Sequence, residues 1–221
     1  MKFLQKETYF QKVREMMGEH WTKGSINKRW DYHARVVNLL KSLNLKDSDL
    51  ILEMGTMGIT CTDGSHTIDY AERWDFPGKK PDYLHDARNT PWPIADKKYE
   101  VFIALRVYQH LAPKQKEALA EAFRIAKKVI IVVDSYYKNA VVTHSKGISY
   151  SDFVNYLGGV HPNIFTQTAQ GELYYWDSEK PSNINIENVM MSQIEATDRK
   201  SQLDNRSFLK KVKRKIKRMI S

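Results

Sequence analysis

Two stretches of the sequence place acids and glycines where a nucleoside could bind. A short apolar run ends in Glu53, and Gly55 and Gly58 follow it in a turn. Glycines leave backbone N–H groups accessible because no Cβ stands in the way. Asp69 ends a second strand-like run, and a carboxylate there can bind two ribose hydroxyls. These residue types predict a site for a nucleotide-like cofactor at one edge of a sheet.

The second stretch, residues 81–111, follows the same order of strand, acidic turn, strand and helix. Asp86 is placed to accept a hydrogen bond from an exocyclic amine, and the Ala87 N–H to donate to a ring nitrogen. Leu105 ends the next apolar strand and completes the expected cofactor-binding set. The alternative is that these glycines only relieve a tight turn and that the aspartates are ordinary turn or cap residues.

His110 is the candidate catalytic base. It lies just past the strand that ends at Leu105, at the carboxyl edge where such sheets bind ligands, and histidine titrates near neutral pH. The alternative is a capping or packing histidine. No spacing among the seven histidines suggests a metal site, so no metal is expected. Contacts to the second substrate are expected from residues 20–23 and 134–138.

The pattern of elements predicts an α/β fold. Apolar strands alternate with helical segments, which favours a Rossmann-like, doubly wound, mostly parallel sheet. Gln170-Gly171 separates two late strand-like pieces and predicts an antiparallel hairpin at the sheet edge. The expected strands are 50–54, 67–70, 83–85, 101–105, 128–133, 164–169 and 173–176. The expected helices lie within 1–22, over 26–43, from Pro113 and from Ser149.

Length and composition are those of a soluble globular protein with one sizeable core. The chain has 221 residues, 42% of them hydrophobic, and no apolar run long enough to span a bilayer. The single cysteine, Cys61, excludes an internal disulfide and favours a cytoplasmic location. Four regions are expected: a helical segment 1–45 that caps the core, an α/β core 46–177, a linker 178–205 and a basic tail helix 206–221.

The positive charge is concentrated in the tail. Residues 206–221 hold eight Lys/Arg and no acid, so the rest of the chain carries about +1 of the net +9. Apolar residues recur there at steps of three and four, which predicts an amphipathic helix suited to an anionic membrane surface. RNA binding is the competing hypothesis, because phosphates attract the same charges.

The order and spacing of four motifs between Asp49 and Asp134 resemble those of the class I S-adenosylmethionine-dependent methyltransferases. The stretches that carry the resemblance are 85–94, 98–105, 108–111 and 124–133. It implies that the cofactor is S-adenosylmethionine. The glycine turn departs from the family pattern, because Met57 and Ile59 stand where the second and third glycines belong. About fourteen residues separate Gly55 from Asp69, too few for a full helix and a strand.

The sequence therefore predicts a methyltransferase with a small-molecule or glycan acceptor, or a lipid-linked one at the inner membrane face. The first alternative is a catalytically degenerate methyltransferase fold that serves as a scaffold at a membrane assembly. The second is an RNA methyltransferase whose tail binds phosphate.

Overall fold

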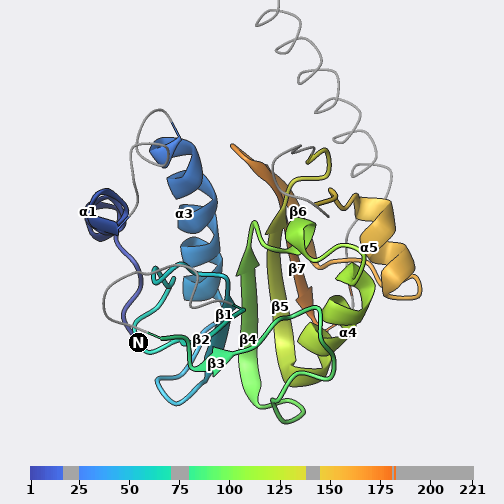
Figure 1. The fold of residues 1–221 in the computed structure, drawn as a ribbon. Coiled ribbons are helices and arrows are strands. Elements are labelled where there is room, and N and C mark those ends of the chain that lie inside the picture. Colours follow the sequence, from blue (N-terminus) through green and yellow to red (C-terminus); the bar gives the residue numbers. More distant parts are fainter. Residues whose placement is uncertain (17–24, 71–79, 138–144, 181, 183–221) are drawn as a thin grey trace, which may run out of the picture. The chain divides into compact units, whose positions relative to one another are not determined.

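The computed structural model describes residues 1–16, 25–70, 80–137, 145–180 and 182. The described residues build a seven-stranded sheet with helices on both faces (Figure 1). The chain divides into two units, residues 1–182 and 183–221. The expected linker and tail helix fall almost entirely in the second unit, outside the described residues.

The sheet has the strand order β3-β2-β1-β4-β5-β7-β6. The first five strands are parallel, and β7 pairs antiparallel with both β5 and β6. The predicted mostly parallel sheet with an antiparallel edge hairpin is therefore confirmed. The strands are β1 (Ile51–Met54), β2 (His66–Asp69), β3 (Tyr83–Leu84), β4 (Tyr99–Leu105), β5 (Ala126–Val133), β6 (Ile164–Thr168) and β7 (Gly171–Asp177).

Helices or a helical turn precede, connect or follow these strands. Ser149 and Asp152 form a reciprocal capping box at the start of α5, which explains why that helix begins where the sequence predicted. Pro113 lies before α4 and not in its first turn, contrary to the prediction. The described helices are α1 (Lys6–Met16), α3 (Ile26–Ser42), the 3-10 turn η1 (Tyr108–His110), α4 (Gln115–Ile125) and α5 (Tyr150–Tyr156).

Side chains of the central strands alternate between the two faces of the sheet, and both faces are buried. Val101 and Ile103 of β4 share a core with residues of α3, whereas Phe102 packs against Trp92 and Tyr108. Trp30 and Ala34 of α3 are only half-buried. The fully or largely buried α3 residues are Ile26, Tyr32, His33, Val36, Val37 and Leu40.

No helix connects β1 and β2, whose intervening residues are all described. The amino-terminal segment takes part in covering that region: Leu4 N–H donates to the Cys61 carbonyl at 2.9 Å, and Phe3 bridges to Thr62. Ile59 and Cys61 are buried with Leu4 in the same core as α3. Residues far apart in sequence thus replace the core contribution of the missing helix.

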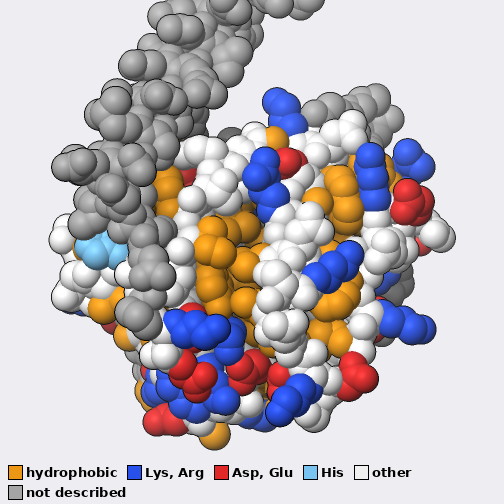
Figure 2. All heavy atoms as spheres, turned by 180° about the vertical axis from the view of Figure 1, so that it is seen from behind, with side chains coloured by type: hydrophobic (Ala, Val, Ile, Leu, Met, Phe, Trp, Pro, Cys, Tyr) orange, Lys and Arg blue, Asp and Glu red, His pale blue; other side chains and the backbone are white. Residues whose placement is uncertain are grey.

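Charged side chains of both signs gather along the lower border of the molecule in Figure 2. At the amino-terminal ends of β4 and β5, Glu100 forms ion pairs with Lys127 and Lys128. None of the helices in the described part of the chain is long and apolar enough to cross a bilayer.

Candidate active site

The turn after β1 is built around Gly55, which has φ +64°. A Cβ on Gly55 would lie 2.5 Å from Cγ2 of Val107, a residue that follows β4. Glycine is therefore required for two reasons: its backbone conformation and the close approach of Val107. Met57 and Gly58 also have positive φ, and the Gly58 N–H bonds to the Thr56 hydroxyl at 3.2 Å.

Glu53 is buried, and its carboxylate faces the backbone of the segment that precedes β2. It accepts hydrogen bonds from the Cys61 N–H at 2.8 and 2.9 Å and from the Thr62 N–H at 3.3 Å. Burial raises the pKa of the Glu53 carboxyl, against the effect of these hydrogen bonds. The partner that this buried acid needs is thus supplied by the chain, and Glu53 fixes the course of residues 61 and 62.

Asp69 ends β2, and Asp86 lies two residues after β3, the adjacent parallel strand. The His85 N–H donates to the Asp69 carbonyl at 2.8 Å, which holds the two strand ends together, and Asp69 Oδ1 accepts from the Tyr70 N–H at 2.8 Å. Asp86 binds the Arg88 guanidinium with contacts of 2.6 to 3.1 Å. The hydrogen bonds from Arg88 hold the pKa of the Asp86 carboxyl below its usual range, so it is ionised at neutral pH.

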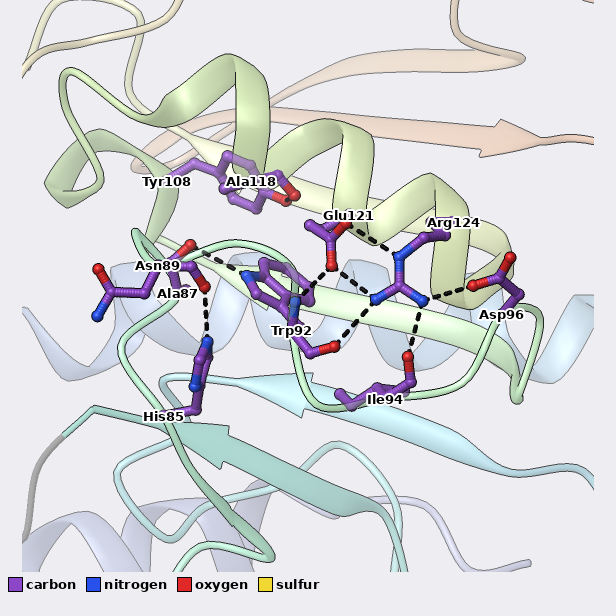
Figure 3. A network of polar contacts seen from close by, with 10 residues as sticks. All are labelled: His85, Ala87, Asn89, Trp92, Ile94, Asp96, Tyr108, Ala118, Glu121 and Arg124. Carbon is purple, nitrogen blue, oxygen red and sulfur yellow. Dashed lines mark hydrogen bonds and ion pairs between the residues drawn. The ribbon is translucent and has the colours of Figure 1, made fainter.

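A polar network fixes the segment after β3 against α4 (Figure 3). The Trp92 indole donates to the Ala87 carbonyl at 3.0 Å, and the Trp92 N–H donates to Glu121 at 2.6 Å. Arg124 binds Glu121 and Asp96 at 2.6 Å each and also reaches backbone carbonyls of the segment. This network holds Ala87, and with it the neighbouring Asp86, at the carboxyl edge of the sheet.

Arg106, which the sequence did not single out, follows Leu105 and has φ +65°. Its guanidinium donates to the Gln170 carbonyl at 2.6 Å and lies 3.6 Å from the Asp134 carboxylate. Arg106 therefore joins the end of β4 to the residue after β5 and to the hairpin turn. Its positive φ and its distant partners leave no signal in the local sequence.

His110 lies in η1 with both ring nitrogens near other side chains. Nδ1 is 2.8 Å from Ser145 Oγ, and Nε2 is 3.4 Å from Gln109 Nε2. Gln109 Nε2 also donates to the Arg106 carbonyl at 2.7 Å, which identifies it as the amide nitrogen. His110 Nε2 must then accept the hydrogen bond from Gln109. Nδ1 therefore carries the ring proton and donates a hydrogen bond to Ser145 Oγ. Burial, with a smaller effect of the Arg106 charge, lowers the pKa of His110, so the ring is neutral at pH 7.

One further acid at this edge escaped the sequence reasoning. Glu172, on β7, is buried and accepts from the Ser135 N–H at 3.1 Å and the Ser135 hydroxyl at 2.9 Å. Burial raises the pKa of the Glu172 carboxyl. The alternation of the strand could have indicated that Glu172 points inward, but its partner, Ser135, comes from the turn after β5.

The structure brings the predicted cofactor residues to one edge of the sheet. Gly55, Asp69, Asp86 and Leu105 follow or end β1, β2, β3 and β4, whose parallel carboxyl ends are adjacent in the order β3-β2-β1-β4. Carboxylates that accept hydrogen bonds and backbone N–H groups that donate them suit a nucleoside. Glu53 faces the chain itself. The acceptor contacts expected from residues 20–23 and from Lys138 lie outside the described residues.

Comparisons with known proteins agree on the fold. One similar chain comes from the complex between the Haloferax volcanii Trm112 methyltransferase activator and the putative methyltransferase; it has 14% identity and a TM-score of 0.52, and the match covers 78% of this chain and 99% of that one. Another is a magnesium protoporphyrin IX methyltransferase from Synechocystis with bound S-adenosylhomocysteine; it has 15% identity and a TM-score of 0.50, and the match covers 77% and 93%. No protein-family model matches the chain, and no curated protein sequence is similar to it.

The chain therefore has the fold of the S-adenosylmethionine-dependent methyltransferases, in the class I arrangement that the motif order resembles. At this level of identity the likeness establishes the fold and not the reaction.

Proposed function

We propose that this protein is a methyltransferase that uses S-adenosylmethionine. The observation that carries the proposal is the meeting of Gly55, Asp69, Asp86 and Leu105 at the carboxyl edge of a sheet with this strand order. The bound cofactor would supply an electrophilic methyl group on a sulfonium. Asp69 would bind the ribose hydroxyls, and Asp86 and the Ala87 N–H would bind the adenine.

His110 is proposed as the base that removes a proton from the acceptor. The tautomer described above leaves the Nε2 lone pair as the basic atom, held by a 3.4 Å contact at the weak limit of hydrogen bonding. An acceptor hydroxyl can replace that contact at little cost. Because the pKa of His110 is lowered, the ring is ready to accept a proton at neutral pH.

Calorimetry with S-adenosylhomocysteine tests the cofactor site. Asp69→Asn should weaken binding on the order of 10- to 100-fold, because a hydrogen bond to a charged group contributes about 1.5–3 kcal/mol. Asp63→Asn, an exposed carboxylate after the glycine turn, is the matched control and should bind like the wild type. Equal binding by all three proteins would remove Asp69 from the site.

The scaffold alternative is favoured by two observations. Val107 stands beside Gly55, and Arg88 already occupies the Asp86 carboxylate. Absence of heat at millimolar S-adenosylhomocysteine, from a protein with a cooperative unfolding transition, would support a scaffold and refute the transferase proposal.

We also propose that the acceptor is a glycan or a lipid-linked polar group at an anionic membrane, reached through residues 206–221. The support is the sequence pattern of apolar and basic residues in that segment. The double variant Val212→Ser, Ile216→Ser keeps all eight basic residues. It should lose binding to phosphatidylserine vesicles in flotation, whereas RNA binding should be unchanged, because phosphates need only the charges. Flotation of the variant equal to the wild type would refute the membrane proposal.

A further inference from the structure

A second cluster of titratable side chains lies at the opposite, amino-terminal edge of the sheet. His66, Tyr83 and Tyr99 are the first residues of β2, β3 and β4, and Lys98 directly precedes β4. Since these three strands point the same way, their first residues share one edge. Ile51 pairs with Val101, so Tyr99 lies before the start of β1 and its side chain can reach those of β2 and β3.

Two hydrogen bonds of this cluster end on the Tyr83 oxygen, and a third joins His66 to Tyr99. Lys98 Nζ donates to the Tyr83 hydroxyl at 2.7 Å, and the Tyr99 hydroxyl donates to it at 3.1 Å. His66 Nδ1 lies 2.8 Å from the Tyr99 oxygen. Because the Tyr99 proton is committed to Tyr83, His66 is the donor in that contact. The Tyr83 oxygen therefore accepts two hydrogen bonds, one of them from a cation.

Such an arrangement is in place to stabilise the phenolate form of Tyr83 when the proton leaves. Donors that are already aimed at a developing negative charge need no reorganisation when the charge forms. Lys98 Nζ also lies 5.4 Å from the centre of the Tyr83 ring. Burial raises the pKa of Tyr83, but the hydrogen bonds from Lys98 and Tyr99 and the Lys98 charge outweigh it, so the pKa is lowered despite the nearby Asp82 carboxylate. Burial, and then the hydrogen bond that Tyr99 donates to Tyr83, raises the pKa of the Tyr99 hydroxyl.

We propose that Tyr83 is a nucleophile and a modification site at the amino-terminal edge of the sheet, and that its oxygen takes up an activated acyl group. The Tyr83 oxygen attacks the acyl carbonyl carbon and forms a new C–O bond. The bond from that carbon to the leaving group breaks, and its electron pair departs with the leaving group, which takes the phenol proton. Lys98 and Tyr99 hold the oxygen in its reactive form.

N-acetylimidazole tests the proposal on the full chain, with imidazole as the leaving group. Acetylation is followed at pH 7.5 by peptide mass spectrometry, and hydroxylamine reversal confirms the O-acyl bond. Tyr83 is half-buried, whereas Tyr70 and Tyr136 are 45% and 48% exposed. Reactivity set by exposure would place Tyr70 and Tyr136 first. The proposal requires that Tyr83 reacts first, and the reverse order overturns it.

Lysine variants identify the cause. Lys98→Met should slow acetylation of Tyr83 on the order of tenfold, because a charge-assisted hydrogen bond is lost, and Lys98→Arg should restore most of the rate. Lys116→Met removes another exposed lysine and is the control for net charge. Lys98 is exposed, so thermal unfolding should be similar in all variants. An unchanged Tyr83 rate in Lys98→Met would refute the role of the cation. Neither result depends on cofactor binding.

Discussion

Gly55→Ala should destabilise the protein by two separable effects. A non-glycine residue at φ +64° costs about 1–2 kcal/mol. The added methyl would lie 2.5 Å from Val107 Cγ2, and forcing an extra methyl into a packed site costs about 1–3 kcal/mol. The free energy of unfolding should therefore fall by about 2–5 kcal/mol, measured by urea denaturation followed by tryptophan fluorescence.

Two comparisons separate the effects. Gly64 has φ +83° and open space where a Cβ would lie, so Gly64→Ala should lose only the conformational part of the unfolding free energy. Its effect on the entropy of the unfolded chain is the same as that of Gly55→Ala. Val107→Ala removes both γ-carbons, so Gly55→Ala in that background should cost no more than Gly64→Ala. The double-mutant cycle should give a coupling energy of about 1–3 kcal/mol. A coupling energy near zero would show that Val107 is not the reason for glycine at this turn.

Three further predictions concern the site and its supports. Arg124→Met should lower the unfolding free energy by about 3 kcal/mol, because Glu121 is left without its cation; a loss below 1 kcal/mol in urea denaturation would contradict this. The folded state holds the Glu53 proton more tightly than the unfolded chain, so wild-type stability should fall as pH rises above the ordinary value of 4.5; Glu53→Gln, compared in urea at pH 5 to 8, should lack this contribution, and parallel curves would refute it. Long-range 1H–15N NMR spectra should show His110 protonated on Nδ1 at pH 7.5, and Ser145→Ala should shift the ring toward the other tautomer; an Nε2-protonated ring in the wild type would refute the assignment.

The sequence was sufficient for most of the fold, because strand residues buried on both faces are apolar throughout. The β5 strand and the β6–β7 hairpin were predicted to within a few residues. The position of Gly55, Asp69, Asp86 and Leu105 at or near strand ends was also predicted. Pro113 was placed inside a helix that begins two residues later, at Gln115. The start of a helix depends on capping geometry, which a proline alone does not determine.

The site was predicted less completely, because its details depend on contacts across the sheet. Glu53 was predicted to belong to the cofactor site, yet its carboxylate binds the backbone N–H groups of residues 61 and 62. Val107 acts through its close approach to Gly55, and Arg106 through its hydrogen bond to the Gln170 carbonyl. Neither contact has a periodicity or a motif that would reveal it in advance.

The amino-terminal segment helps to cover Cys61, which can therefore serve as a natural reporter of local opening. Cys61 is the single cysteine of the chain and is fully buried, and its carbonyl holds the N–H of Leu4. Burial raises the pKa of its thiol well above the usual value, so the thiolate is scarce in the folded state. The rate at which a thiol reagent labels the native protein therefore measures how often the core around Cys61 opens, without any engineered probe.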